Sequence, residues 1–282
     1  MSGRSSKHRV AFQGEPGAFS HAAALKLLGN KGVVLLPCAT FRDVFEALKR
    51  GAAGCAVIPI ENTLHGSVHE NYDHLLAYGF RISGETSIRI SHQLIAMPGT
   101  TWRKLQRVMS HPVALNQCKA FFHRNPRLEA VPFYDTAGSV KALRDNQLGD
   151  TGAIASEVAA QLYGGVILRR DIEDNSANFT RFFLLTKQTA PLHSSGKSWK
   201  TSVVFATSNT PGALFRAMAC FALRNLSLTK IESRPLLGKP WEYIFYVDFL
   251  GNSSEKITQN ALANLKECTH FVKLLGSYRP IA

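Results

Sequence analysis

Two hydrophobic periods alternate along residues 8–187. Short apolar runs, such as residues 10–13 and 55–60, have the composition of buried strands. Between them, apolar residues recur three or four positions apart, as at Phe41, Val44 and Leu48, which is typical of one face of a helix. Repeated alternation of strand and helix predicts mainly parallel sheets with helices on both faces, in one large domain or in two lobes with a cleft between them.

The turn residues between these runs set the expected bounds of each element. Strands are expected at residues 10–13, 33–37, 55–60, 87–97, 106–109, 152–155 and 166–168. Helices are expected at residues 18–28, 41–49 and 156–163, and around Tyr72, Leu115 and Leu143. Thr40 is the predicted N-cap of the second helix, because threonine oxygens accept hydrogen bonds from the first free N–H groups of a helix.

Residues 178–186 open with polar side chains and continue as an aromatic and aliphatic strand. Because side chains alternate along a strand, Asn178 and Thr180 should share one face while Phe179 and Arg181 share the other. A polar start to a core strand suggests that this end lies in a cleft. The simpler alternative is that Arg181 pairs with a neighbouring carboxylate and that Thr180 is an ordinary strand residue.

A second domain follows a linker. Periodicity is lost from residue 187 to 199, where Pro, Ser and Gly are frequent, so we place the linker at residues 188–199. Beyond it, strands are expected at residues 201–207, 226–231, 243–250 and 271–275. Helices are expected at residues 257–265 and around Leu214, Met218 and Phe221, with Pro211 in the first turn of the latter helix. Residues 232–235 are expected to be a loop. The order βαββαβ is the ferredoxin-like plan, which by itself says little about function.

Composition narrows the class of protein. The chain has 33 Lys and Arg against 20 Asp and Glu, a formal charge of +13, but the basic residues are spread along its whole length. A nucleic-acid face usually needs a concentrated basic stripe, so a small anionic substrate is the better fit and no nucleic-acid partner is expected. No apolar run approaches the ~20 residues that cross a bilayer, so no membrane partner is expected.

The start of the chain and its cysteines indicate a compartment. The first strand is expected before any signal-peptide core could form, which favours a cytoplasmic protein. The five cysteines are scattered without a CxxC pair, as in proteins with reduced, buried thiols.

Few motifs suggest a metal or a cofactor. His65, His69, Glu70 and His74 could form a metal cluster, but His65 need not share the face of the following helix, so no metal is expected. The sequence has no Walker loop, Rossmann fingerprint or nucleophile elbow, so no cofactor is expected.

Four turns that follow predicted strands are rich in small and polar residues, at 14–20, 61–67, 110–117 and 135–139. In a parallel α/β sheet such turns gather at the carboxyl ends of the strands, where ligands usually bind. Helix N-termini at that edge present N–H groups to an anion, so a substrate with one or two carboxylates would suit them. The alternative is that the Ser, Thr, Asp and Asn residues are only helix caps.

Taken together, these turns and the strand at 178–186 resemble the prephenate dehydratase family, which includes the arogenate dehydratases. The matching motifs are residues 14–20 (GEPGAFS), 59–63 (PIENT), 110–112 (SHP) with Gln117 and Cys118, 135–138 (DTAG) and 178–182 (NFTRF). Residues 212–215 (GALF) and 232–235 (ESRP) resemble the ACT regulatory domain of these enzymes. The resemblance covers nearly the whole chain.

The resemblance implies a fold. It implies a two-lobed α/β catalytic domain with a central cleft, similar to the periplasmic binding proteins, at residues 8–187. One lobe would hold about residues 8–85 and 175–187, and the other about residues 86–174. A ferredoxin-like ACT domain would follow at residues 200–282.

The resemblance also implies an activity, a carbon–oxygen lyase reaction. Prephenate would lose carbon dioxide and its ring hydroxyl to give phenylpyruvate, or arogenate would give phenylalanine directly. Thr180 would donate to the departing hydroxide, Arg181 would assist, and Glu61 would either supply a proton or orient Arg181. The implied substrate-binding residues are Ala18, Phe19, Ser20, Asn62, Thr63, Ser110, Gln117, Thr136, Ala137, Asn178 and Phe179.

Regulation and assembly are likewise implied by the resemblance. Phenylalanine would bind as an allosteric effector at a subunit interface of a homodimer or homotetramer, through Gly212, Ala213, Leu214, Glu232, Ser233, Arg234 and Pro235. The chain departs from the family at His65, where a small residue is common, at Val113, where a glutamine is common, and in the short segment 236–242. Two alternatives from other classes are a solute-binding protein and an amino-acid sensor that acts through its C-terminal domain alone.

Overall fold

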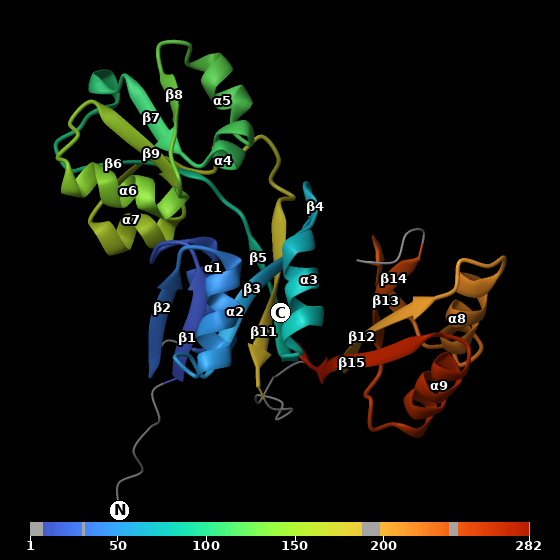
Figure 1. Cartoon of the computed structure of the whole chain (residues 1–282). Coiled ribbons are helices and arrows are strands. Elements are labelled where there is room, and N and C mark those ends of the chain that lie inside the picture. The colour runs from blue at the N-terminus through green and yellow to red at the C-terminus, as the bar shows by residue number, and fades with distance from the viewer. Residues whose placement is uncertain (1–7, 30–31, 188–197, 237–241, 282) are drawn as a thin grey trace, which may run out of the picture. The chain divides into compact units, whose positions relative to one another are not determined.

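The computed structural model describes residues 8–29, 32–187, 198–236 and 242–281 (Figure 1). The chain forms two compact units, one of Met1–His74 with Thr86–Leu184 and the other of Leu75–Glu85 with Leu185–Ala282. The predicted linker at 188–199 lies almost entirely outside the described residues, as does most of segment 236–242. The predicted domain bounds therefore remain predictions.

The first sheet contains the N-terminal strands and the strand that begins at Phe179. It runs in the order β16-β5-β11-β3-β1-β2, where β16 is Pro280–Ile281, and β4 is paired to β3. The strands are β1 (His8–Gln13), β2 (Val33–Cys38), β3 (Cys55–Asn62), β4 (Gly66–Ser67), β5 (Arg81–Arg89) and β11 (Phe179–Thr186). β1 is parallel to both β2 and β3, as predicted. The unit boundary passes through β5 and β11, so each contributes residues to both units.

Three helices connect these strands: α1 (Phe19–Leu28), α2 (Phe41–Arg50) and α3 (His69–Tyr78). α2 shows why its sequence is helical. Thr40 is its N-cap and forms a capping box with Asp43, as predicted for Thr40. Val44, Phe45 and Leu48 lie on one face and are fully buried, so their removal from water stabilises the helix against the sheet.

The second sheet also belongs to the first unit and runs in the order β10-β6-β9-β7-β8. Its strands are β6 (Gln93–Ala96), β7 (Arg107–Ser110), β8 (Glu129–Pro132), β9 (Thr151–Ala155) and β10 (Val166–Arg169). Its helices are α4 (Pro112–Asn116), α5 (Lys119–Arg124), α6 (Thr136–Asp145) and α7 (Glu157–Tyr163), and a 3-10 helix, η1, spans Trp102–Lys104.

Helices cover both faces of this second sheet (Figure 1). On one face Leu94 and Ile154 pack in a core with residues of α4 and α5. On the other face Ile95 and Ala153 pack with residues of α6 and α7. Neighbouring residues of a strand point to opposite faces. Each of the two strands β6 and β9 therefore supplies one residue of an adjacent apolar pair to each core.

The C-terminal sheet lies in the second unit and runs in the order β13-β14-β12-β15. Its elements are β12 (Lys200–Thr207), α8 (Ala213–Ala222), β13 (Leu228–Pro235), β14 (Tyr243–Leu250), α9 (Lys256–Glu267) and β15 (Phe271–Tyr278). Each neighbouring pair is antiparallel, and both helices pack on a core that includes Phe205, Phe221 and Phe249. The predicted βαββαβ plan, and with it the predicted fold class, is confirmed.

Several predicted bounds are wrong. Residues 87–97 are two strands, because the chain leaves β5 before residue 90 and enters the second sheet only at β6. Residues 232–235 belong to β13, where each pairs with a residue of β14 instead of forming a loop. Pro211 precedes helix α8, because Gly212 at φ 77° is its N-cap. The strand β8 was not predicted, and β6 is antiparallel to both β9 and β10.

Chemical features of the whole chain are simple. The five cysteines are free thiols, and burial raises the pKa of Cys55 to about 11. Cys220 and Cys268 bring their sulfur atoms within 3.8 Å of each other. Among the described residues, no helix has the length and apolar character needed to cross a membrane.

Candidate functional site

Asn62 and Thr180 join the ends of two neighbouring strands of the first sheet. The Nδ2 of Asn62, at the end of β3, donates to Thr180 Oγ1 at 2.9 Å and to Asn178 Oδ1 at 2.8 Å. Thr180 is only 9% exposed. Because its oxygen accepts from Asn62, the hydroxyl proton of Thr180 is directed elsewhere and can be donated to a ligand.

The same cluster fixes the loop after β3. Asn62 Oδ1 accepts from the backbone N–H groups of Leu64 and His65, at 2.9 and 3.0 Å. Thr63 Oγ1 donates to the Ala177 carbonyl and accepts from the Phe179 N–H, at 2.8 and 2.9 Å. Five predicted site residues therefore lie together, namely Asn62, Thr63, Asn178, Phe179 and Thr180.

Arg181 lies on the opposite face of β11. Its guanidinium is 3.2 Å from a carboxylate oxygen of Glu61 and lies over the ring of Phe183, 5.1 Å from the centroid. The Arg181 side chain is 13% exposed and that of Glu61 36%. The predicted alternation of faces is confirmed, because Asn178 and Thr180 share Asn62 while Arg181 and Phe183 contact each other. The alternative in which Arg181 pairs with a carboxylate is also confirmed.

Gln117 lies between two histidines. Its Oε1 accepts from His92 Nε2 at 2.7 Å, and its Nε2 donates to His65 Nε2 at 2.7 Å. With the Gln117 amide in this orientation, His92 Nε2 is the donor and His65 Nε2 is the acceptor. Phe19 completes the group through an edge contact with the His92 ring, 5.8 Å between centroids. Two predicted residues, Phe19 of α1 and Gln117 of the α4–α5 turn, therefore both contact His92.

His92 is a residue of this group that the sequence did not suggest. It is 2% exposed, and its Nδ1 has no hydrogen-bond partner among the described residues. Its backbone N–H donates to Glu173, whose other carboxylate oxygen is held by Arg89 at 2.7 Å. A histidine between two polar residues in the middle of a predicted strand was the available signal, but a lone histidine has no motif.

The remaining predicted residues lie in the second sheet and its helices. Ser110 is fully buried, and its hydroxyl donates to the Ile154 carbonyl at 2.6 Å. Thr136 is the first residue of α6, and the adjacent Ala137 is fully buried. Gly17 of the first turn approaches this helix so closely that an added Cβ would lie 3.4 Å from the Ala137 Cβ. No described contact links these residues to Thr180.

The starts of the helices were expected to hold an anion, and most are already capped. Asp135 accepts from an N–H of α6, His111 from one of α4, and Asp174 from two of α5. The simpler interpretation of the Ser, Thr, Asp and Asn residues of these turns as caps is confirmed at α6, where the cap is Asp135. α1 begins at Ala18 without a side-chain cap, so the first N–H groups of α1 remain for a ligand.

A separate cavity of about 390 Å³ opens where β1 and β2 end. Its lining residues are Gln13, Gly14, Glu15, Pro37, Cys38, Ala39, Tyr134 and Asp135. Burial and the neighbouring Glu15 raise the pKa of Tyr134 to about 12. Burial also raises the pKa of Asp135 above its usual value. None of the residues of the Asn62 cluster lines this cavity, so the cavity is separate from that cluster.

The suggested metal cluster is not assembled. Among the described residues, no three His, Cys, Asp or Glu side chains are placed to hold an ion. His65 is engaged with Gln117, while His74 contacts Glu70 at 3.3 Å along α3. The helix begins only at His69, so His65 lies outside it.

The predicted effector residues lie on two elements of the second unit. Gly212 caps α8 in the left-handed region, and Ala213 and Leu214 form the first turn. Residues 232–235 run along β13, an edge strand of the sheet. Leu214 is 38% exposed, so part of this surface is apolar and open.

Acid should destabilise the protein through His92. Burial lowers the pKa of His92 below its usual value, although Gln117 and Glu173 act in the opposite direction. Below about pH 6.5 the His92 side chain binds a proton in the unfolded chain but not in the folded chain. The free energy of unfolding therefore falls as pH falls, by at most about 1.4 kcal/mol per pH unit for one proton. We expect His92→Gln to lose less stability than the parent between pH 7 and pH 5 in thermal unfolding.

His21 has a lowered pKa for the same reason, so the comparison must be made as a difference between variant and parent. His123→Gln is the control, because His123 is exposed and makes no described side-chain contact. Parallel pH curves for His92→Gln and the parent would show that His92 does not cause the acid sensitivity.

The fold is that of an α/β protein with a hydrogen-bonded cluster of hydroxyl and amide side chains in its first unit and a ferredoxin-like sheet in its second. Residues 10–190 match the family model described as prephenate dehydratase. The chain belongs to the prephenate dehydratase family, whose activity is that of a carbon–oxygen lyase.

Individual relatives agree with this assignment. Arogenate dehydratase 2 of Petunia hybrida is 44% identical over 293 residues, covering 99% of this chain and 73% of that protein. The structure of a prephenate dehydratase from Arthrobacter aurescens in complex with L-Phe is 31% identical, with a TM-score of 0.86 over 96% of this chain and 89% of that chain. A structure described as GqqA, a novel type of quorum quenching acylase, is 34% identical, with a TM-score of 0.87 over 96% of this chain and 98% of that chain.

Proposed function

We propose that the protein is a prephenate dehydratase that converts prephenate to phenylpyruvate. The observation that carries the proposal is the bond from Asn62 to Thr180, which leaves the threonine proton for a leaving group in a poorly solvated position. The family assignment supplies the reaction class. Arogenate is the alternative substrate, because the Petunia relative carries that name.

The reaction breaks two bonds of the substrate ring. The electron pair of the bond to the ring carboxylate enters the ring as carbon dioxide leaves, and the pair of the carbon–oxygen bond departs with the hydroxide. Aromatisation drives the reaction, so the protein must mainly orient the substrate and stabilise the hydroxide. A threonine hydroxyl is too weak an acid to ionise, so Thr180 acts as a hydrogen-bond donor to the developing charge.

The substrate carboxylates need donors, and the structure offers them in two places. The uncapped start of α1 presents N–H groups beside Phe19, which contacts His92. Gln117 Nε2 uses one hydrogen for His65 and retains a second for a ligand. The role proposed for three other predicted residues is to stabilise the second sheet and its helices; these are Ser110, Thr136 and Ala137.

Glu61 and Arg181 serve as a positioning pair in this scheme. The carboxylate of Glu61 lies 3.2 Å from the Arg181 guanidinium, so it is best used as a partner that orients Arg181. Of the two roles considered for Glu61, orientation of Arg181 therefore fits the geometry better.

Replacement of His65 should lower kcat/KM modestly. It holds the Gln117 amide through one hydrogen bond, and a bond of this kind contributes about 0.5–1.5 kcal/mol. We expect His65→Gly to lower kcat/KM roughly three- to tenfold, mostly through a higher KM, because Gln117 loses its fixed orientation. Steady-state assays of the variant, with His123→Ala as control, measure this. An unchanged KM would show that Gln117 does not depend on His65.

The second unit is proposed to regulate the enzyme. The solved relative from Arthrobacter aurescens was determined with L-Phe, and this chain has the GALF and ESRP segments on α8 and β13. Phe215 is 76% exposed and Ile231 on the edge strand 48%, so this surface suits a second copy of the chain. We propose a homodimer or homotetramer, in the cytoplasm, with phenylalanine bound at that interface.

One set of assays tests the proposal. Purified protein is offered prephenate and arogenate separately, with and without phenylalanine, and product is followed in each case. Phenylpyruvate from prephenate supports the main proposal, and phenylalanine formed only from arogenate supports the alternative. Binding of either substrate without product would favour a solute-binding or sensing protein, and amide hydrolysis in a parallel acylase assay would favour the activity named for the GqqA relative.

A further inference from the structure

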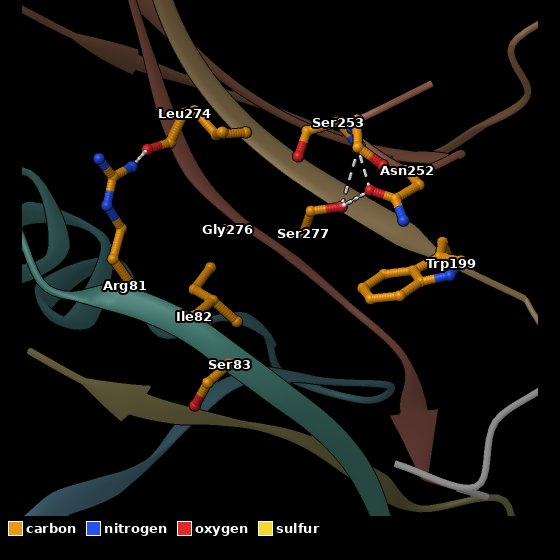
Figure 2. A pocket seen from close by; sticks show the side chains of 10 residues that line it. Arg81, Ile82, Ser83, Trp199, Asn252, Ser253, Leu274, Gly276 and Ser277 are labelled. Atoms are coloured by element: carbon orange, nitrogen blue, oxygen red, sulfur yellow. Dashed lines mark hydrogen bonds between the residues drawn. The ribbon is translucent and has the colours of Figure 1, made fainter. Parts of the chain in front are cut away.

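A cavity of about 270 Å³ lies within the second unit, away from every residue proposed above for substrate or effector (Figure 2). It opens between β5, β15 and the loop before α9. The lining residues are Arg81, Ile82, Ser83, Trp199, Asn252, Ser253, Ser254, Leu274, Gly276 and Ser277. A hollow of this size holds a small metabolite.

Gly276 allows the walls of this cavity to approach each other. A Cβ at residue 276 would lie 2.1 Å from the Ile82 carbonyl oxygen, so any side chain there would force β15 away from β5. The two strands are also joined by a hydrogen bond from the Arg81 guanidinium to the Leu274 carbonyl. The cavity is therefore a fixed feature of the β5–β15 contact.

The charge at the cavity is positive. Arg81 has no carboxylate partner among the described residues, since its described side-chain bond goes to the Leu274 carbonyl. Lys273 is close enough to Arg81 to have its pKa lowered, after the larger effect of burial, and its ammonium donates to the Leu76 carbonyl at 3.0 Å. The carboxylate of Glu85 is held by Lys200 at 2.6 Å and by Tyr278.

Two neighbouring cations without a counter-ion repel each other, and a bound anion would relieve that repulsion. The rest of the wall supports such a ligand. The loop offers the hydroxyls of Ser253 and Ser254 and the amide of Asn252. Figure 2 shows Asn252 and Ser253 on the same side of the cavity as Ser277. Ile82, Leu274 and the Trp199 indole provide an apolar surface.

We propose that this cavity is a binding site for a small organic anion, with its carboxylate or phosphate on Arg81 and its apolar part against Ile82, Leu274 and Trp199. The site differs from the Asn62 cluster and from the segments at 212–214 and 232–235. It also stands independently of the reaction proposed for the first unit.

Calorimetric titration of the full chain tests the site, with benzoate and inorganic phosphate as separate probes at constant ionic strength. We expect saturable binding of at least one probe, and the preferred probe distinguishes a carboxylate from a phosphate ligand. Arg81→Gln should weaken binding at least tenfold. Ser254→Asp, at an exposed position of the rim, should do the same while it leaves Arg81 and its hydrogen bond intact.

Arg103→Gln is the matched control, because Arg103 is an exposed arginine of η1 in the first unit. It should bind the probes like the parent. Absence of saturable binding in the parent, or equal binding by the parent, Arg81→Gln and Ser254→Asp, would overturn the proposal. Because the readout is binding in the absence of substrate, its result is separate from that of the dehydratase assay.

Discussion

Replacing Thr180 with valine should lower kcat by about 10²–10⁴-fold while the protein remains folded. Valine has nearly the shape of threonine but no hydroxyl, so the departing hydroxide loses its donor. Asn62 Nδ2 keeps two other acceptors, Asn178 Oδ1 at 2.8 Å and the Phe179 carbonyl at 3.1 Å, so the cluster itself survives. Steady-state assays with prephenate and arogenate, together with circular dichroism spectra, measure both parts of this expectation.

Two further variants sharpen the test. Thr180→Ser keeps the hydroxyl and should recover most of the lost turnover. Thr258→Val makes the same chemical change in the second unit, where the buried Thr258 hydroxyl has no partner among the described residues, and should leave activity unchanged. If Thr180→Val and the parent turn over substrate equally fast, the role given to Thr180 is wrong.

Replacing Glu85 with leucine should destabilise the second unit by about 3–5 kcal/mol, because it leaves the Lys200 ammonium buried without its partner. Glu85 and Lys200 lie 2.6 Å apart with side chains 6% and 12% exposed. The loss extends to Tyr278, whose hydroxyl donates to Glu85 at 3.2 Å and also contacts Ser202 at 2.8 Å. We expect the thermal midpoint of the second unit to fall by at least about 12 °C, at about 4 °C or more per kcal/mol.

The double variant Glu85→Leu with Lys200→Met separates pairing from burial. It removes both charges and replaces them with apolar groups, so it should recover much of the stability lost in the single variant. Glu157→Leu is the control, because it breaks an exposed ion pair with Arg170 and should cost less than about 1 kcal/mol. Equal midpoints for Glu85→Leu and Glu157→Leu would contradict the importance of the buried pair.

Local pattern predicted the parts of the fold that depend on neighbouring residues. The helix at 41–50 follows from its capping threonine and its apolar face, and the sharing of one face by Asn178 and Thr180 follows from the two-residue period of a strand. The ferredoxin-like order follows from the succession of elements. Motif resemblance then singled out Asn62 and Thr180, which the structure joins directly.

Contacts between distant residues could not be read from period or propensity. His92 reaches Gln117, 25 positions away, only because β6 and the turn between α4 and α5 belong to the same lobe. Glu85 and Lys200 pair across 115 positions, and neither has a local motif. The capped starts of α4, α5 and α6 show a related limit, since polar residues at a turn have the same sequence signature as caps and as ligands.

Adjacent residues of β11 make different contacts. Thr180 accepts a hydrogen bond from Asn62, and Arg181 forms an ion pair with Glu61. A change in chain length is therefore more damaging here than most substitutions. One inserted or deleted residue just before Thr180 would send the hydroxyl to the ion-pair side and the guanidinium to the amide side. Length changes across this segment should thus be tolerated only in steps of two residues.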